Sequence, residues 1–281
     1  LEAVLAGAVA EYAAVSTCES RPKRQAPQLP AYFLACLERL VVDEAVAYFW
    51  RCFAWYRLLR VWCCLRFDDH RGLIPSSMRI VGGSLKGTLV RTKTSGAGKR
   101  REELYIHCDA MAYVVSQTWL SVGFELWMRA GTNRDYFLML PSADFKHFVE
   151  LEAQYSDSQA CSRCLLTFFR TPAGDPLFTV PGGPDFWSEH SDRATLPSIA
   201  GAIASIPSDW LDGLGHWSSA ASLGYVRTLL RRVASIQATV AKALRNKELT
   251  REALAEDDLY AKWAAFLCDK GSHAILPLPK H

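Results

Sequence analysis

The chain has 281 residues, of which 50% are hydrophobic and 22% charged, so it can bury a substantial core and global disorder is excluded. This length fits one large domain or two smaller ones. The net charge of +3 is too small to indicate a nucleic-acid partner by itself. The basic residues are clustered, however, with seven Lys and Arg against two Glu in residues 222–252 and six against two in 86–103. Two such patches favour a protein that contacts a polyanion with one face.

The cysteines indicate a reducing, intracellular compartment. There are nine of them, without regular spacing, and several lie inside apolar helical patterns where a free thiol acts as a small hydrophobe. Cys161 and Cys164 form a single CxxC, whereas a structural metal site needs four ligands, so we expect no metal and no cofactor. The sequence contains neither an apolar run long enough for a membrane span nor a signal-peptide pattern, so no membrane partner is expected.

The first elements change from helices to strands. Residues 1–15 have a helical pattern, and residues 16–30 are predicted to be a polar, proline-containing linker. Over residues 31–65 apolar residues recur at helical spacing, densely enough for two buried helices. Three β-prone runs separated by glycine-rich turns then predict an antiparallel meander: MRIV (78–81), GTLVR (87–91) and ELYIH (103–107).

The rest of the chain is predicted to be mostly helical. Helical patterns occupy residues 110–129, 143–155 and 157–170, and after a loop at 171–186 they continue from residue 188 to the end. The predicted fold class is therefore α+β, mainly α with a small three-stranded antiparallel sheet. We find no internal repeat.

Four segments carry polar side chains that could perform chemistry: CLRFDDHRG, RTKTSGAGKR, EHSDRATLPS and LGHWSSAASLGYVRT. In chain order their candidate residues are Arg66 with Asp69, Lys93, His190 with Arg193, His216 and Tyr225. Taken singly, each has an ordinary explanation. The Arg and Asp could form an ion pair at a helix end, the lysine could be solvated in a turn, the His and Arg could cap a helix and lie on its surface, and the tyrosine could be packed in the core. Their occurrence together and in this order favours a shared site.

This set of residue types suits the cleavage of a phosphodiester. Two guanidiniums can each grip non-bridging oxygens and stabilise the extra charge of a pentavalent transition state. A tyrosine hydroxyl, with an ordinary pKa of about 10, needs help to lose its proton before it can attack phosphorus. A lysine on a hairpin can protonate the departing oxygen, and histidines can orient the phosphate or move protons.

The motifs resemble those of the catalytic domain of tyrosine recombinases, the phage-integrase family. LRFDD resembles the family's first arginine box, RTKT its lysine hairpin, HSDR its His-x-x-Arg box, and LGHW followed by Tyr225 its closing box. The similarity covers about residues 31–250. The arginine-box wording and the Cys- and Trp-rich insertion resemble eukaryotic mobile-element recombinases of the Crypton type more than bacterial chromosome-dimer resolvases, which would place the protein in a nucleus.

The resemblance implies a role for each candidate residue. Arg66, Arg193, His190 and His216 would surround the scissile phosphate, Lys93 would protonate the leaving oxygen, and Tyr225 would form a 3′-phosphotyrosyl bond. Asp69 would orient its neighbours. The residues expected to contact DNA are Lys86, Arg91, Lys99, Arg100, Arg227, Arg231 and Arg232.

Several features depart from the family pattern. Pro197 predicts that the helix at the His-x-x-Arg box begins near Thr195, which would leave the box on a preceding turn. Lys86 and Lys99 lie on the same hairpin as Lys93 and leave the identity of the acid open. The long separation between hairpin and box predicts a lineage-specific insertion within 109–187. Residues 1–30 would supply only the end of an N-terminal DNA-binding region and its linker, followed by a catalytic domain over 31–281.

The expected function is site-specific recombination or integration of double-stranded DNA by a homo-oligomer, a tetramer on DNA. The alternatives are a catalytically inactive, domesticated DNA-binding protein and relaxation of DNA like that of type IB topoisomerases. A C-terminal helical arm at about 253–270 has an apolar stripe formed by Leu254, Leu259, Trp263, Phe266 and Leu267. We predict that it docks on a neighbouring protomer, the alternative being that it closes the chain's own core.

Overall fold

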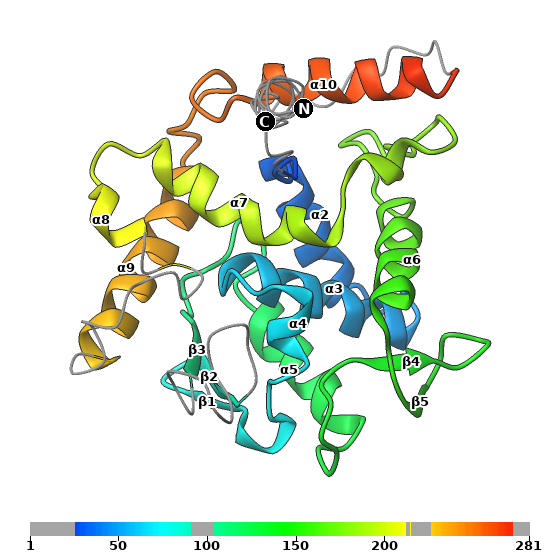
Figure 1. Cartoon of the computed structure of the whole chain (residues 1–281), viewed down its shortest axis with the longest axis vertical. Coiled ribbons are helices and arrows are strands. Elements are labelled where there is room, and N and C mark those ends of the chain that lie inside the picture. The colour runs from blue at the N-terminus through cyan, green and yellow to red at the C-terminus, as the bar shows by residue number, and fades with distance from the viewer. Residues whose placement is uncertain (1–25, 91–103, 212–213, 215–225, 272–281) are drawn as a thin grey trace, which may run out of the picture.

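The computed structural model describes residues 26–90, 104–211, 214 and 226–271. Helices α2 and α3 lie in the middle of the molecule, with α6 on one side and a small sheet and α9 on the other (Figure 1). The helices are α2 (Ala31–Val42), α3 (Tyr48–Trp62), α4 (Phe67–His70), α5 (Trp119–Arg129), α6 (Tyr155–Leu166), α7 (Glu189–Gly201), α8 (Ser208–Leu211), α9 (Val226–Arg245) and α10 (Glu256–Asp269), with short 3-10 turns η1 (Pro75–Ser77) and η2 (Gly183–Phe186).

The predicted pair of buried helices forms the centre of the core. Both α2 and α3 are apolar on nearly every side. This allows α3 to pack against α2, α5, α6 and α7 at once. Trp55 and Trp62 on α3 are fully buried. A helix that is hydrophobic all round is expected to be enclosed in this way.

The predicted three-stranded meander is confirmed. Strands β1 (Arg79–Val81), β2 (Ser84–Leu89) and β3 (Leu104–Cys108) form one antiparallel sheet in the order β1-β2-β3. One face carries Leu85, Leu89 and Ile106 into the core, as the two-residue alternation of a strand requires. The α+β class is therefore correct at this level.

The helices predicted at 110–129 and 143–155 are partly wrong. The first forms only over α5, and the second is replaced by a hairpin of β4 (Met139–Pro141) and β5 (Phe148–Glu152). The chain turns at Phe145, whose φ of 58° is incompatible with a right-handed helix. The Phe145 ring stacks on Trp50 of α3, and this tertiary contact helps to fix the turn.

The C-terminal helix folds back on its own chain, so its apolar stripe is not available for a partner. Leu254, Leu259, Trp263 and Leu267 are buried, and Trp263 Nε1 donates to the Gly183 carbonyl at 3.0 Å. The Trp263 ring also packs against Phe178 and Trp187. The docking prediction for this arm is wrong, because the aromatic loop before α7 supplies the surface that covers the stripe.

The end of the predicted linker also belongs to the fold. Gln28 Nε2 donates to the Leu254 carbonyl at 2.6 Å, and the Leu29 amide donates to Thr195 Oγ1 at 2.8 Å. Residues 1–25 lie outside the described residues, so the helix predicted at 1–15 stays a prediction. The lineage-specific origin of 109–187 likewise stays a prediction.

The cysteines behave as free thiols within the described residues, as expected. Those on α2 and α3, Cys36 and Cys52, are buried, as are Cys63, Cys64 and Cys108, whereas Cys164 and Cys268 are exposed. In the same part of the chain, no helix combines the length and apolarity needed to cross a bilayer.

We predict that Gly123→Ala destabilises the fold. A Cβ at this position on α5 would lie 2.1 Å from Cδ1 of the buried Trp55 ring, which cannot move because its Nε1 donates to the Leu120 carbonyl. Overpacking of this kind costs about 1–3 kcal/mol. Gly201→Ala is the matched control, because its Cβ would meet Leu211 at 3.9 Å. Urea unfolding should show a loss for the first variant only, and equal behaviour of the two would contradict this packing.

We also predict that Glu38 on α2 makes the free energy of unfolding depend on pH. Its buried carboxylate accepts hydrogen bonds from the amides of residues 114–116 at 2.7–2.8 Å, yet burial dominates and raises its pKa to about 7. The folded state therefore holds a proton that the unfolded state has lost above its ordinary pKa of 4.5. The contribution of Glu38 to the free energy of unfolding is fully present below pH 4.5. It declines as the pH rises to about 7, by at most about 1.4 kcal/mol per pH unit.

Urea unfolding at several pH values checks this sign. Glu38→Gln should remove the decline between pH 5 and 7, whereas Glu44→Gln, at an exposed position just after the same helix, should leave it unchanged. A decline of the same size in all three proteins would show that Glu38 is not its source.

Candidate active site

The first arginine box lies at the junction between α3 and α4. Cys64 takes a left-handed conformation with φ of 53°, which turns the chain sharply after α3. Arg66 then precedes the first residue of α4, and its amide donates to Asp69 Oδ2 at 3.0 Å. Arg66 is half-buried, whereas Asp69 is 2% exposed. Asp69 therefore fixes the backbone that carries Arg66.

Arg193 of the His-x-x-Arg box reaches the same carboxylate from α7. Its Nη1 donates to Asp69 Oδ2 at 3.2 Å and to the Cys64 carbonyl at 3.0 Å. One carboxylate oxygen thus binds both the Arg66 backbone and the Arg193 side chain, although the two boxes are 124 residues apart. Asp69 therefore holds Arg66 and Arg193 next to each other, and its supporting role in catalysis stays a prediction.

The two guanidiniums lie close enough to repel each other. Burial lowers the pKa of Arg193, and the positive charge of Arg66 lowers it further, while Asp69 opposes the change. Asp69 pairs with the guanidinium of Arg193 only, so one carboxylate faces two nearby positive charges and the place keeps a residual positive potential. Such a place attracts an oxyanion, which could accept hydrogen bonds from both forks.

His190 precedes Arg193 on the same helix and is exposed. The prediction that this helix begins near Thr195 is wrong: α7 begins at Glu189, and Pro197 lies inside it. The Ser188 side chain caps the helix by accepting from the His190 amide, which satisfies one of the free donors of the first turn. The box is therefore helical rather than on a preceding turn.

Buried ion pairs explain why the helix begins so early. Glu189 and Asp192 face inward from the first turn of α7 and meet Arg57 and Arg60 of α3. The Arg57 Nε donates to Asp192 Oδ2 at 3.2 Å, and Arg60 binds both the side chain and the backbone carbonyl of Glu189. All four side chains are at most 1% exposed. Breaking this start of the helix would leave charges buried without partners, which is costly.

Two serines from α6 complete the network. Ser158 and Ser162 donate to the two oxygens of Glu189 at 2.7 and 2.6 Å. Burial alone would raise the pKa of Glu189, but the charges of Arg60 and Arg57 outweigh it and hold that pKa below its ordinary value. The carboxylate is therefore ionised and satisfied on all sides.

Sequence reasoning missed this network, although a signal was present. Arg57 and Arg60 are three residues apart inside a mostly apolar helix, and Glu189 and Asp192 have the same spacing, each directly before a residue of the His-x-x-Arg box. Charges repeated at helical spacing within buried segments indicate an internal ion pair, since such charges are almost never buried unpaired.

Gln237 on α9 is a second residue that sequence reasoning missed. It is fully buried and joins three segments, because its Nε2 donates to the carbonyls of Trp62 and His107 at 2.7 and 2.8 Å. Its Oε1 accepts from the Asp109 amide at 2.8 Å. The helix that follows Tyr225 in the sequence is thereby tied to β3 and to the end of α3.

The structure brings together Arg66, Asp69 and Arg193, and it places His190 in an exposed position on the same helix as Arg193. Lys93, His216 and Tyr225 lie outside the described residues, as do Arg91, Lys99 and Arg100. Arg227 belongs to α9, but its side chain is outside the described part. Their roles stay predictions.

Three of the expected DNA contacts can be placed. Lys86 and Arg231 line a cavity between the sheet and α9, and the Arg232 guanidinium lies 5.4 Å from the centre of the Trp210 ring. Arg66 and Arg193 do not line this cavity. Over the described ranges, no group of three or more His, Cys, Asp or Glu residues is arranged to hold a metal ion.

Comparison with known proteins adds no family assignment: no protein-family model matches this chain, and no curated protein sequence matches it.

We predict that Arg60→Met costs about 3–5 kcal/mol of stability, because it leaves the buried Glu189 carboxylate without its main partner. Arg71→Met is the matched control. Arg71 pairs with Glu152 at 2.7 Å, but both side chains are about 30% exposed, and such pairs contribute about 1 kcal/mol or less. Urea unfolding at pH 7 measures both losses. Losses of equal size would mean that the buried network does not hold α7 in place.

Proposed function

We propose that this chain is the catalytic domain of a tyrosine recombinase, which cuts and rejoins double-stranded DNA through a 3′-phosphotyrosyl intermediate. The observation that carries this proposal is the meeting of the two arginine boxes on one oxygen of Asp69, with Arg66 and Arg193 close enough for their charges to interact. The sequence order of the remaining candidates supports it.

The proposed chemistry balances without an external reactant. Tyr225 Oη would pass its proton to one of the candidate histidines, His190 or His216, and attack the scissile phosphorus, forming the phosphotyrosyl bond while the bond to the 5′ oxygen breaks. Lys93 would give that oxygen a proton, and Arg66 and Arg193 would bind the non-bridging oxygens as their charge grows. Rejoining reverses these steps, with a 5′ hydroxyl as the nucleophile.

Assembly on DNA is part of the proposal, as a homo-oligomer in the nucleus of a host that carries a mobile element. The buried stripe of α10 excludes that stripe as the interface, so protomers would have to contact each other through another surface. Exchange of strands between two duplexes separates a recombinase from an enzyme that only relaxes supercoils.

Covalent capture of the protein on nicked DNA duplexes tests the proposal. The central sequence of the duplexes is randomised, so that selection of the captured DNA identifies the target site. The nick lets the short cleaved strand diffuse away, which traps the adduct. Mass spectrometry of the digested adduct should place the nucleotide on Tyr225. Tyr225→Phe should form none and bind the duplex pool within about twofold of the parent, because the change removes a hydroxyl and no charge.

Arg66→Lys tests the guanidinium fork. The variant keeps the charge but loses the two-pronged geometry of the guanidinium, so we expect covalent capture to slow by about 10–100-fold. The stability of the fold should be unchanged, because Arg66 is half-buried and binds Asp69 through its backbone. Binding without any adduct would instead identify a DNA-binding protein. An adduct that persists in Tyr225→Phe would identify a different nucleophile.

A further inference from the structure

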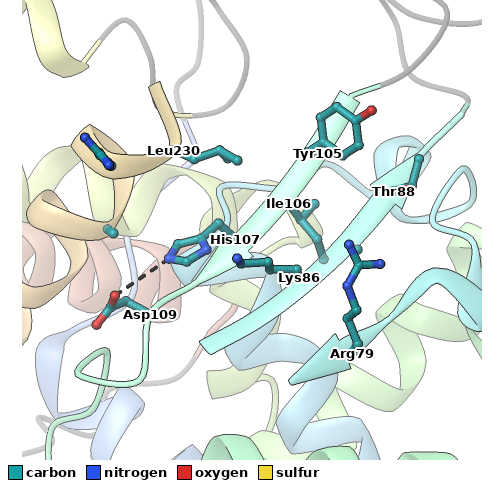
Figure 2. A pocket seen from close by; sticks show the side chains of 11 residues that line it. Arg79, Lys86, Thr88, Tyr105, Ile106, His107, Asp109 and Leu230 are labelled. Atoms are coloured by element: carbon teal, nitrogen blue, oxygen red, sulfur yellow. Dashed lines mark ion pairs between the residues drawn. The ribbon is translucent and has the colours of Figure 1, made fainter. Parts of the chain in front are cut away.

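A row of basic side chains crosses one face of the three-stranded sheet. The register pairs Arg79 with Lys86 and Lys86 with His107, so the three residues lie directly opposite one another on adjacent strands and point to the same face. Figure 2 shows them side by side in the pocket. Arg79 and Lys86 are like charges in directly opposed positions, which destabilise a sheet, so an anion bound at this row would relieve their repulsion.

This row lines a cavity of about 690 Å³ between the sheet and α9. Arg231 of α9 adds a fourth basic group, whereas Asp109, just after β3, is the acidic residue of the lining. The size is that of a small-molecule site, a few hundred to a thousand cubic ångströms. The excess of positive charge selects an anion.

His107 supplies a second sign of a ligand. Its side chain is 10% exposed, and among the described residues neither ring nitrogen makes a hydrogen bond; Nε2 lies 3.6 Å from Asp109 Oδ2. Burial lowers its pKa, and Lys86 contributes in the same direction, while Asp109 opposes both. Buried polar groups are normally hydrogen-bonded, so this imidazole, whose ion-pair partner Asp109 is 3.6 Å away, is incompletely satisfied and could donate to a bound anion if the ring turns toward the cavity.

The other end of the cavity is aromatic and apolar. Tyr105 is 43% exposed and lies two residues along β3 from His107, on the same face. Leu230 of α9 and Thr88 also line the cavity, and Tyr105 lies between them in the view of Figure 2. A ring beside a basic groove is a stacking platform for a nucleobase.

The walls of the cavity are fixed before any ligand arrives. Gln237 ties α9 to the His107 carbonyl and the Asp109 amide, so the helix cannot slide along β3 without breaking buried hydrogen bonds. A preformed site avoids the cost of ordering its walls upon binding.

We propose that this cavity binds a nucleoside phosphate, with the phosphate on the Arg79–Lys86–His107 row and the base against Tyr105 and Leu230. The ligand is a free nucleotide or one nucleotide of a DNA strand, which share this chemistry. The inference stands on the cavity alone and does not depend on recombination, so covalent capture can fail while nucleotide binding succeeds.

Calorimetric titration of the whole chain with dAMP tests the site. Arg79→Gln and Lys86→Gln should each weaken binding about tenfold, as expected for a charge-assisted contact. Arg129→Gln, an exposed position on α5 with the same change of charge, should leave it unchanged. Tyr105→Ala should weaken dAMP binding but not the binding of inorganic phosphate. No saturable dAMP binding, or an equal effect of Arg79→Gln and Arg129→Gln, would overturn the proposal.

A single-stranded thymidine oligonucleotide distinguishes the two sources. If the strand supplies the nucleotide, Arg79→Gln and Lys86→Gln should weaken oligonucleotide and dAMP binding in parallel, and the two should compete. If the ligand is free nucleotide, only dAMP binding should respond.

The pH dependence isolates His107 from the other titratable or charged groups that face the pocket, namely Arg79, Lys86, Tyr105, Asp109 and Arg231. The probe is a thymidine dinucleoside monophosphate, because its phosphodiester does not titrate near neutral pH. The bound anion should raise the pKa of His107, so affinity should rise about three- to tenfold from pH 8 to pH 6. His107→Gln should flatten that rise, and an unchanged rise would show that His107 does not contact the phosphate.

Discussion

The buried pairing of α3 with α7 is the interaction on which the candidate site depends. Arg57 and Arg60 are enclosed by the core, and their charges are balanced by Glu189 and Asp192 from a segment about 130 residues later. Burying four charges gives little net stability, because desolvation offsets most of the attraction. Its value lies in specificity, since any other placement of α7 would leave these charges unpaired.

That placement gives the start of α7 two faces with different contacts. Glu189 and Asp192 point inward to α3, while Arg193 points to the turn at Cys64 and to Asp69, and His190 is exposed. Glu189 and Asp192 alternate along the helix with His190 and Arg193. One helical turn therefore both anchors the helix and carries the two candidate residues of the box. The position of Arg193 relative to Arg66 is thus set both by the ion pairs of its helix and by the shared contact with Asp69.

The sequence allowed the main elements to be predicted where one physical signal dominated. Dense apolar spacing identified α2 and α3, and β-prone runs between glycines identified the sheet. It failed where tertiary contacts decided: residues 143–155 form a hairpin that packs Phe145 on Trp50, and Pro197 sits inside α7 because the ion pairs hold the helix start. The stripe of α10 was read correctly as apolar, but its partner, the loop around Gly183, lies far away in the sequence. For the site, the residue types suggested a chemistry that stays a proposal, whereas the contacts of Arg66 and Arg193 with Asp69 required coordinates.

The most direct test of the central claim is the location of a bound oxyanion. Tungstate is a tetrahedral dianion whose anomalous scattering locates it in a crystal without ambiguity. If α7 is held so that Arg66 and Arg193 form one anion site, a tungstate peak should lie within hydrogen-bond distance of both guanidiniums, with Arg193 still bound to Asp69. Well-ordered Arg66 and Arg193 side chains that point apart, with tungstate bound only elsewhere, would contradict the account.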